Sequence, residues 1–279
     1  MRDLNRLSRQ SVRPVLGLMV CGLFAASSPI CSAQAPQAPP AKPHPLIPFL
    51  RLAKESRDAI AAVRDYEALF TKRELVGRTL YTGQMAMKLR HQPFGVYLRF
   101  VDANNGREVI YAGPKYRNQL QAHEPPGSIR NIVGTLSLDP MSSQAMAEGR
   151  HPITQIGMQR MVNALIDQWE AEKKFGEINC NFYPNAKLQG TTTGAAAGTV
   201  DCQVCESTHP VPRRQFNFYR SRLYIDKKTN FPVRIEQWGF PPAGGGEPYL
   251  IEEYTYTDVK PNVGLTDTDF DIRNRRYHF

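Results

Sequence analysis

The sequence lacks the features that mark most enzymes and membrane proteins. No nucleophile elbow, glycine-rich phosphate loop, kinase signature or metal-binding histidine pair occurs in its 279 residues. The main apolar stretch, Val15–Ala26, has twelve residues, whereas a membrane-spanning helix needs about 20. These absences argue against an enzyme, against a bound cofactor or metal, and against a transmembrane helix.

Acidic residues are also fewer than basic ones, 26 against 35, and the formal net charge is +9. The basic residues are scattered, apart from short groups at 213–214, 220–222 and 273–276. Nucleic-acid binding needs a recognisable module or a concentrated basic stripe, and neither is present. The excess charge therefore indicates either a solvated basic surface or contact with anionic lipid head groups or wall polymers.

Residues 1–33 have the three parts of a secretory signal peptide. Four arginines precede the apolar stretch, and small residues follow it up to Ala33 and Ala35, after either of which cleavage is expected. The residues before Cys21 and Cys31 fit a lipoprotein acceptor site poorly. We therefore predict an exported protein of the periplasm or cell envelope, soluble and without a transmembrane segment after cleavage. The Pro/Ala-rich residues 34–46 predict a disordered tether.

Cysteines are few, and only Cys180, Cys202 and Cys205 follow the signal peptide. An oxidising compartment permits one disulfide, which would join Cys180 to Cys202 or Cys205. The spacing of Cys202 and Cys205 also occurs in redox motifs and in half of a zinc site. However, a second ligand pair is missing, and the two cysteines lie in a strand-like segment. A structural bridge and inert thiols are the main alternatives, and metal or redox chemistry is the third.

Hydrophobic periodicity after residue 46 predicts both helices and strands. Apolar residues at helical spacing predict helices over 47–63 and 153–175. Alternating apolar and polar residues predict strands over 66–76, 82–91, 94–101, 108–112, 120–124, 178–183, 198–208, 214–226, 232–240 and 249–259. The order of helix, strands, helix and strands indicates a single α+β domain over 47–279. Its large antiparallel sheet should curve into an unclosed half-barrel, with helices covering the concave face.

Candidate chemistry in this domain is sparse. His151 precedes the second predicted helix and could act as a general base, although capping or packing is the commoner role. The acidic run Asp267–Asp271 lacks the pattern of a calcium loop and is interpreted as a turn that docks Phe270. The apolar faces of the strands either pack a solid core or line a cavity for acyl chains. The candidate lining residues are Met85, Met87, Leu89, Phe94, Val96, Leu98, Phe100, Phe216 and Phe218.

Several short motifs follow one another along the chain. They are Pro93-Phe94-x-Val96-Tyr97-Leu98-Arg99-Phe100, Gly106-Arg107-Glu108-Val109-Ile110-Tyr111, Arg150-His151-Pro152-Ile153-Thr154 and Asn262-Val263-Gly264-Leu265-Thr266-Asp267. This series resembles domain of unknown function 1571, a family of bacterial secreted proteins, over about residues 50–279. Because that family has no established activity, the resemblance implies no catalytic residues.

A more distant resemblance rests on three shorter segments. They are Thr82-Gly83-Gln84-Met85, Arg107-Glu108-Val109 and Asp267-Thr268-Asp269-Phe270. These segments are similar to matching places in the LolA/LolB/RseB-like periplasmic lipoprotein carriers and sensors. That similarity implies an unclosed β-barrel that holds a hydrophobic cavity under a helical lid.

Three functions remain open at this point. A carrier or sensor of an apolar ligand (a lipid, a lipoprotein or an acyl chain) predicts a cavity on the order of several hundred Å³. A non-catalytic structural or interaction protein of the envelope or wall predicts a filled core and an exposed patch. An enzyme that uses Cys202, Cys205 or His151 predicts a cleft with a perturbed thiol or imidazole. We expect the first, a non-enzymatic protein without a cofactor.

Overall fold

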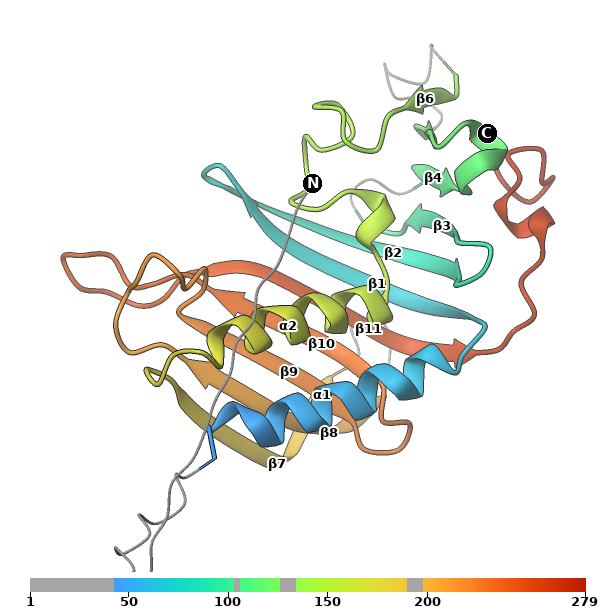
Figure 1. The fold of residues 1–279 in the computed structure, drawn as a ribbon. Helices are drawn as coiled ribbons and strands as arrows, with labels where there is room; N and C mark the ends of the chain where they lie inside the picture. Colours follow the sequence, from blue (N-terminus) through green and yellow to red (C-terminus); the bar gives the residue numbers. More distant parts are fainter. Residues whose placement is uncertain (1–42, 103–105, 126–133, 190–197) are drawn as a thin grey trace, which may run out of the picture. The chain divides into compact units, whose positions relative to one another are not determined.

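The computed structural model describes residues 43–102, 106–125, 134–189 and 198–279 (Figure 1). The predicted signal peptide, residues 1–33, lies outside the described residues. So does the predicted tether over 34–46, except for its last four residues.

Eleven strands of the described chain form one antiparallel sheet. They are β1 (Asp65–Val76), β2 (Thr79–Arg90), β3 (Gly95–Phe100), β4 (Glu108–Tyr111), β5 (Leu120–His123), β6 (Leu136–Leu138), β7 (Asn179–Gln189), β8 (Thr199–Thr208), β9 (Arg220–Asp226), β10 (Pro232–Trp238) and β11 (Leu250–Pro261). Their order across the sheet is β6-β5-β4-β3-β2-β1-β11-β10-β9-β8-β7. The edge strands β6 and β7 do not pair with each other, so the sheet is not closed.

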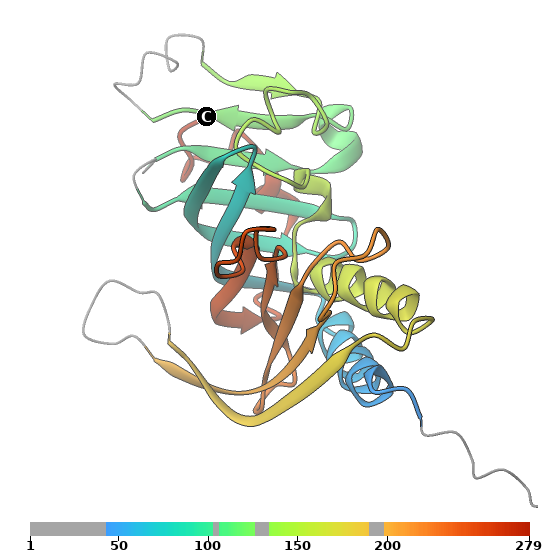
Figure 2. The same ribbon diagram turned by 90° about the vertical axis from the view of Figure 1, so that its left-hand side faces the viewer.

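Two α-helices of the described chain, α1 (Leu46–Ala61) and α2 (Met158–Glu172), lie side by side on the same face of this sheet (Figure 1). Figure 2 shows that the sheet curves and that both helices lie on one side of it. The predicted fold, a large unclosed antiparallel sheet with helices on one face, is confirmed.

The apolar faces of the helices form the core with the sheet. In α1, Phe49, Leu50 and Ala53 are buried at the spacing of a helical stripe. The buried residues of α2 are Met158, Met161, Val162, Leu165, Ile166, Trp169 and Glu172. The Trp169 indole donates a hydrogen bond to Ser207 Oγ of β8 (3.0 Å) and lies 5.9 Å from the Phe49 ring. Each fully buried large apolar side chain contributes about 1.5–3 kcal/mol, so this layer fixes both helices on the sheet.

Several predicted elements differ from the structure in their bounds. The helix predicted over 153–175 is shorter, because Gly157 has a φ of 115° and separates a 3-10 turn (Ile153–Gln155) from α2. The strand predicted over 214–226 begins only at Arg220. The backbone before it turns, with the Phe216 N–H donating to the Arg213 carbonyl (3.0 Å). Strand β6 has three residues and was not predicted, because so short a segment carries almost no periodic signal.

The acidic run near the C-terminus forms the predicted turn. Asp267–Phe270 is a 3-10 helix with a capping box between Thr266 and Asp269. Phe270 is 1% exposed and packs with Tyr97 and Ile110. A Cβ atom at Gly95 would lie 2.9 Å from the Phe270 ring, so glycine is needed at that position. The interpretation of this run as a turn that docks Phe270 is confirmed.

Candidate ligand-binding site

Helix α2 is held over the sheet by two buried tyrosines at its N-terminus. The first N–H groups of a helix have no partner inside the helix. Here the Gly157 N–H donates to Tyr256 Oη (3.2 Å) and the Met158 N–H to Tyr66 Oη (3.1 Å). The tyrosines come from β11 and β1, which are neighbours in the sheet. Sheet side chains therefore supply the cap that α2 lacks in its own sequence, and they set where the helix begins.

A cavity of about 1360 Å³, partly open to solvent, lies between α2, the preceding segment 144–156 and the sheet. Ligand pockets usually have about 300–1000 Å³. The part of its wall formed by β3 to β6 is mostly apolar and consists of Leu98, Phe100, Val109, Leu120, Ala122, Leu136 and Leu138. Further apolar side chains come from β1, β2, β10 and α2, namely Phe70, Met85, Ile235, Met161 and Leu165. A cavity therefore lies beside the packed core of this protein.

The nine predicted lining residues divide into three groups. Met85, Leu98, Phe100 and Phe218 line the cavity. Met87, Leu89 and Val96 are buried in the core and do not line the cavity.

The other two of the nine residues, Phe94 and Phe216, pack against other side chains. Phe94 lies under the Arg160 guanidinium, 4.1 Å from ring centroid to Cζ. Phe216 stacks on the His209 ring at 3.6 Å. Alternation identified the inward face of β2 and β3 correctly, but it could not separate cavity wall from core on that face. It also missed the wall formed by 144–156, because that segment has no periodic pattern.

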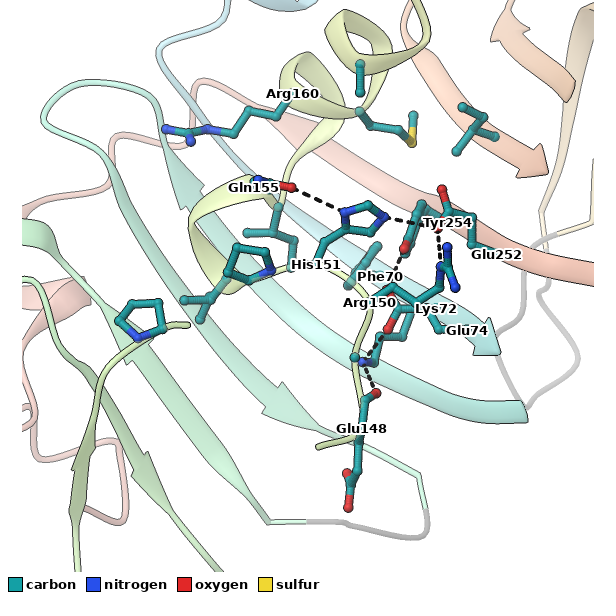
Figure 3. Close-up of a pocket in the computed structure, with 18 of the residues that line it drawn as sticks. Phe70, Lys72, Glu74, Glu148, Arg150, His151, Gln155, Arg160, Glu252 and Tyr254 are labelled. Atoms are coloured by element: carbon teal, nitrogen blue, oxygen red, sulfur yellow. Dashed lines mark hydrogen bonds and ion pairs between the residues drawn. The ribbon is translucent and has the colours of Figure 1, made fainter. Parts of the chain in front are cut away.

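A cluster of buried charges forms the middle of the cavity wall (Figure 3). Glu74 of β1 and Glu252 of β11 are directly opposite each other in the sheet, and both are at most 5% exposed. Glu74 accepts hydrogen bonds from Lys72 Nζ (2.8 Å) and from the Tyr254 hydroxyl. Like charges side by side are unfavourable, so each carboxylate needs its own cationic or hydrogen-bonding partners.

The partners of Glu252 come from the segment just before the 3-10 turn. Arg150 Nε lies 2.8 Å and His151 Nε2 3.0 Å from Glu252 Oε2. Arg150 also donates to the Leu75 carbonyl (3.1 Å), and His151 Nδ1 contacts Gln155 Oε1 (3.2 Å). Figure 3 shows His151 between Gln155 and Glu252. These contacts anchor segment 148–155, which covers part of the cavity, to β1 and β11.

The anchor is sensitive to pH. The hydrogen bond to Glu252 raises the pKa of His151 above its usual value, in spite of partial burial. Burial raises the pKa of Glu252, but the contacts with His151 and Arg150 lower it by more. The histidine's stabilisation is complete below about pH 6.5 and is lost as pH rises through its folded pKa. The glutamate's stabilisation is present above about pH 4.3 and is lost as pH falls through its folded pKa.

We therefore expect the melting temperature to fall as pH rises above about 6.5, where His151 begins to lose its proton. His151→Gln should remove part of that fall, because glutamine keeps a hydrogen bond but does not titrate. Differential scanning calorimetry from pH 5 to 9 measures both curves. His278→Gln, at an exposed position, provides the control for the substitution itself. Identical slopes for His151→Gln and the parent would contradict this role.

The described part of the cavity wall carries no aliphatic hydroxyl or thiol side chain. Among the described residues that line it there is no serine, threonine or cysteine. Both ring nitrogens of His151 are engaged by Glu252 and Gln155. Within the described residues, no group of three or more histidine, cysteine or acidic side chains is placed to hold a metal ion. The arrangement is suited to holding an amphiphile, with apolar and charged wall in one cavity.

The three cysteines are free thiols in the structure and lie away from the cavity wall. Cys202 and Cys205 are three residues apart in β8, so their side chains point to opposite faces of the sheet. Cys180 lies opposite Ser207, on the face that carries Cys205. A disulfide of Cys180 with Cys205 stays a prediction, whereas the strand geometry places Cys202 on the other side from both.

Burial governs the expected reactivity of these thiols. It raises the pKa of Cys180 and Cys202 to about 11 and that of Cys205 to about 12. Because the thiolate is the reactive form, iodoacetamide at pH 8 should alkylate the folded, reduced protein more than about tenfold slower than the protein in urea. Mass spectrometry of timed samples measures the rates for the three peptides. Equal rates in the two conditions would contradict the burial of these thiols.

The sequence places this cavity-bearing fold in a known family. The model of DUF1571, described as a protein of unknown function, matches residues 63–279. The chain belongs to the DUF1571 family. This confirms the resemblance seen in the motifs, and it assigns no activity. No curated protein matches the chain at a significant level.

Several solved structures are similar to this DUF1571 protein at low sequence identity. The lipoprotein LppX of Mycobacterium tuberculosis has 11% identity and a TM-score of 0.43, with 80% of this chain and 98% of that chain covered. LprF of Mycobacterium bovis has 11% identity, a TM-score of 0.39 and coverages of 80% and 97%. A putative outer membrane lipoprotein-sorting domain of Vibrio parahaemolyticus has 12% identity, a TM-score of 0.35 and coverages of 80% and 95%. In the described part of the chain, no helix has the length and apolar character needed to span a membrane.

Proposed function

We propose that this DUF1571 protein binds an apolar ligand, such as a lipid or the acyl chains of a lipoprotein, as a carrier or sensor in the cell envelope. The observation that carries the proposal is the cavity of about 1360 Å³ with its apolar wall on β3 to β6. A water-filled apolar space of this size costs free energy, and an acyl chain that displaces the water recovers about 0.8 kcal/mol for each CH₂ group buried.

The proposed setting follows from the N-terminal sequence. Residues 1–33 would direct export, residues 34–46 would act as a tether, and residues 47–279 would form the binding domain. The alternative, a structural or interaction protein of the envelope or wall, predicted a filled core. The cavity favours the carrier or sensor, and neither function requires a catalytic residue.

A photoactivatable palmitic-acid analogue tests this proposal. After irradiation of the purified protein with the probe, peptide mapping should find labels in β3, β5 and β6, at positions such as Leu98, Leu120 and Leu136. Excess unlabelled palmitate should suppress the labelling. Labels confined to exposed apolar side chains, such as Val211 or Tyr249, would contradict binding in the cavity.

A further inference from the structure

The last residue of α2, Glu172, places a buried carboxylate at the opposite end of the cavity from β6. It lines the cavity, and its side chain is 4% exposed. Its Oε1 atom accepts a hydrogen bond from Gln168 Nε2 (2.9 Å). Among the described residues, its Oε2 atom has no hydrogen-bond partner. The nearest charged or titratable neighbour is the His209 ring, with Nε2 at 3.3 Å from Oε2.

His209 is held in place by a second contact. Its Nδ1 atom lies 3.1 Å from the Glu177 carbonyl oxygen, and since a carbonyl only accepts, Nδ1 carries a hydrogen. Among the described residues, neither Glu172 Oε2 nor His209 Nε2 has a hydrogen-bond partner, and the two atoms lie 3.3 Å apart in the interior. An N–H donor of a ligand in the cavity would satisfy Glu172 Oε2.

This arrangement is costly for the protein alone. A buried carboxylate oxygen without a donor loses the hydration that it has in the unfolded chain. The position at the C-terminus of α2 adds to the cost, because the helix dipole is negative there. A ligand cation would remove both penalties at once.

The charged side chains that line the cavity also favour a cationic ligand group. The acidic side chains of its wall outnumber the basic ones. The acidic residues are Glu74, Glu124, Glu148, Asp167, Glu172 and Glu252, and the basic residues are Lys72, Arg107, Arg150 and Arg160. The basic residues other than Arg160 are paired with acidic ones. Among the described residues that line the cavity, Asp167 and Glu172 are the carboxylates without a lysine or arginine ion pair, and both lie on α2.

We propose that Glu172 binds the primary ammonium group of an amphiphile whose acyl chain lies against β3 to β6. This inference rests on the proposed function and specifies the head group of the ligand. The dimensions agree with it. Met161 and Glu172 both line the cavity and are eleven residues apart on α2, which corresponds to about 16 Å along the helix axis.

Calorimetric titration with two lysophospholipids of the same acyl chain tests the inference. Lysophosphatidylethanolamine carries the ammonium group, and lysophosphatidylglycerol does not. Both are used below the concentration at which they form micelles. The protein should bind the ethanolamine lipid about tenfold more tightly, which is the contribution expected of one charged hydrogen bond. Glu172→Gln should abolish that preference. Glu55→Gln, which changes an exposed glutamate of α1, should keep it.

The outcomes separate the inference from the proposed function. Equal affinity of the parent protein for the two lipids would overturn the ammonium site and leave the acyl-binding cavity intact. A preference that survives Glu172→Gln would also overturn it. If neither lipid binds, the proposed function itself fails. Glutamine has the shape of glutamate, so Glu172→Gln should fold, and its melting temperature verifies this. The comparison of the two lipids on the parent protein does not depend on any variant.

Discussion

Replacing Ala122 with tryptophan should weaken the binding of a long-chain fatty acid by on the order of a hundredfold, or about 2.7 kcal/mol. Ala122 lies in β5, between Val109 of β4 and Leu136 of β6, and lines the apolar part of the cavity. An indole there would occupy the space proposed for the acyl chain and leave the ion pairs of Glu74 and Glu252 in place. Displacement of a fluorescent fatty acid from the purified protein measures the affinity.

A matched control is available on the surface. Ala62 follows the end of α1 and is exposed, so Ala62→Trp adds the same side chain away from the cavity. Its affinity should stay within about twofold of the parent protein, or about 0.4 kcal/mol, because the added indole lies outside the cavity. Equal affinity of Ala122→Trp and Ala62→Trp would mean that the fatty acid binds elsewhere.

Replacing Gly157 with alanine should destabilise the protein by about 3 kcal/mol or more. The φ of 115° at Gly157 is a conformation that residues with a Cβ rarely adopt. A Cβ atom at this position would also lie 2.7 Å from Leu89 Cδ1 and 3.3 Å from Tyr66 Oη. The strain would therefore push α2 away from the tyrosines that cap it. For a protein of this size the melting temperature should fall by about 6–12 °C.

The control for this prediction is Gly176, which follows α2. A Cβ atom at Gly176 would have no neighbour within 4 Å. Gly176→Ala should therefore change the melting temperature little. If calorimetry finds the same melting temperature for both alanine variants and the parent protein, Gly157 does not fix the start of α2 in the way described.

Local sequence pattern predicted most of the fold. Alternation placed Met85, Met87 and Leu89 on the inward face of β2, and all three are at most 2% exposed. What could not be predicted was how distant strands meet. β1 pairs with β11, about 180 residues further along the chain, and this pairing alone brings Glu74 beside Glu252. Nothing in either segment indicates that a glutamate faces inward.

Only part of the candidate site could be predicted, because it too depends on how distant segments meet. Four of the nine candidate residues line the cavity, because alternation identifies a face but not the empty space beside it. Segment 144–156 and the buried Glu172 were missed. The wall that they form depends on where α2 begins, and that point is set by Gly157 together with tyrosines from β1 and β11. Such tertiary capping leaves no local signal in the sequence.

The central claim, that the cavity holds an apolar ligand, is tested most directly by native mass spectrometry of the protein purified from its own cell envelope. The account predicts a fraction with added mass, and organic extraction should release that mass as a lipid or an acylated peptide. Ala122→Trp, purified in the same way, should carry much less of it. A protein that is isolated without added mass, and that takes up neither fatty acid nor lysophospholipid on titration, would contradict the account.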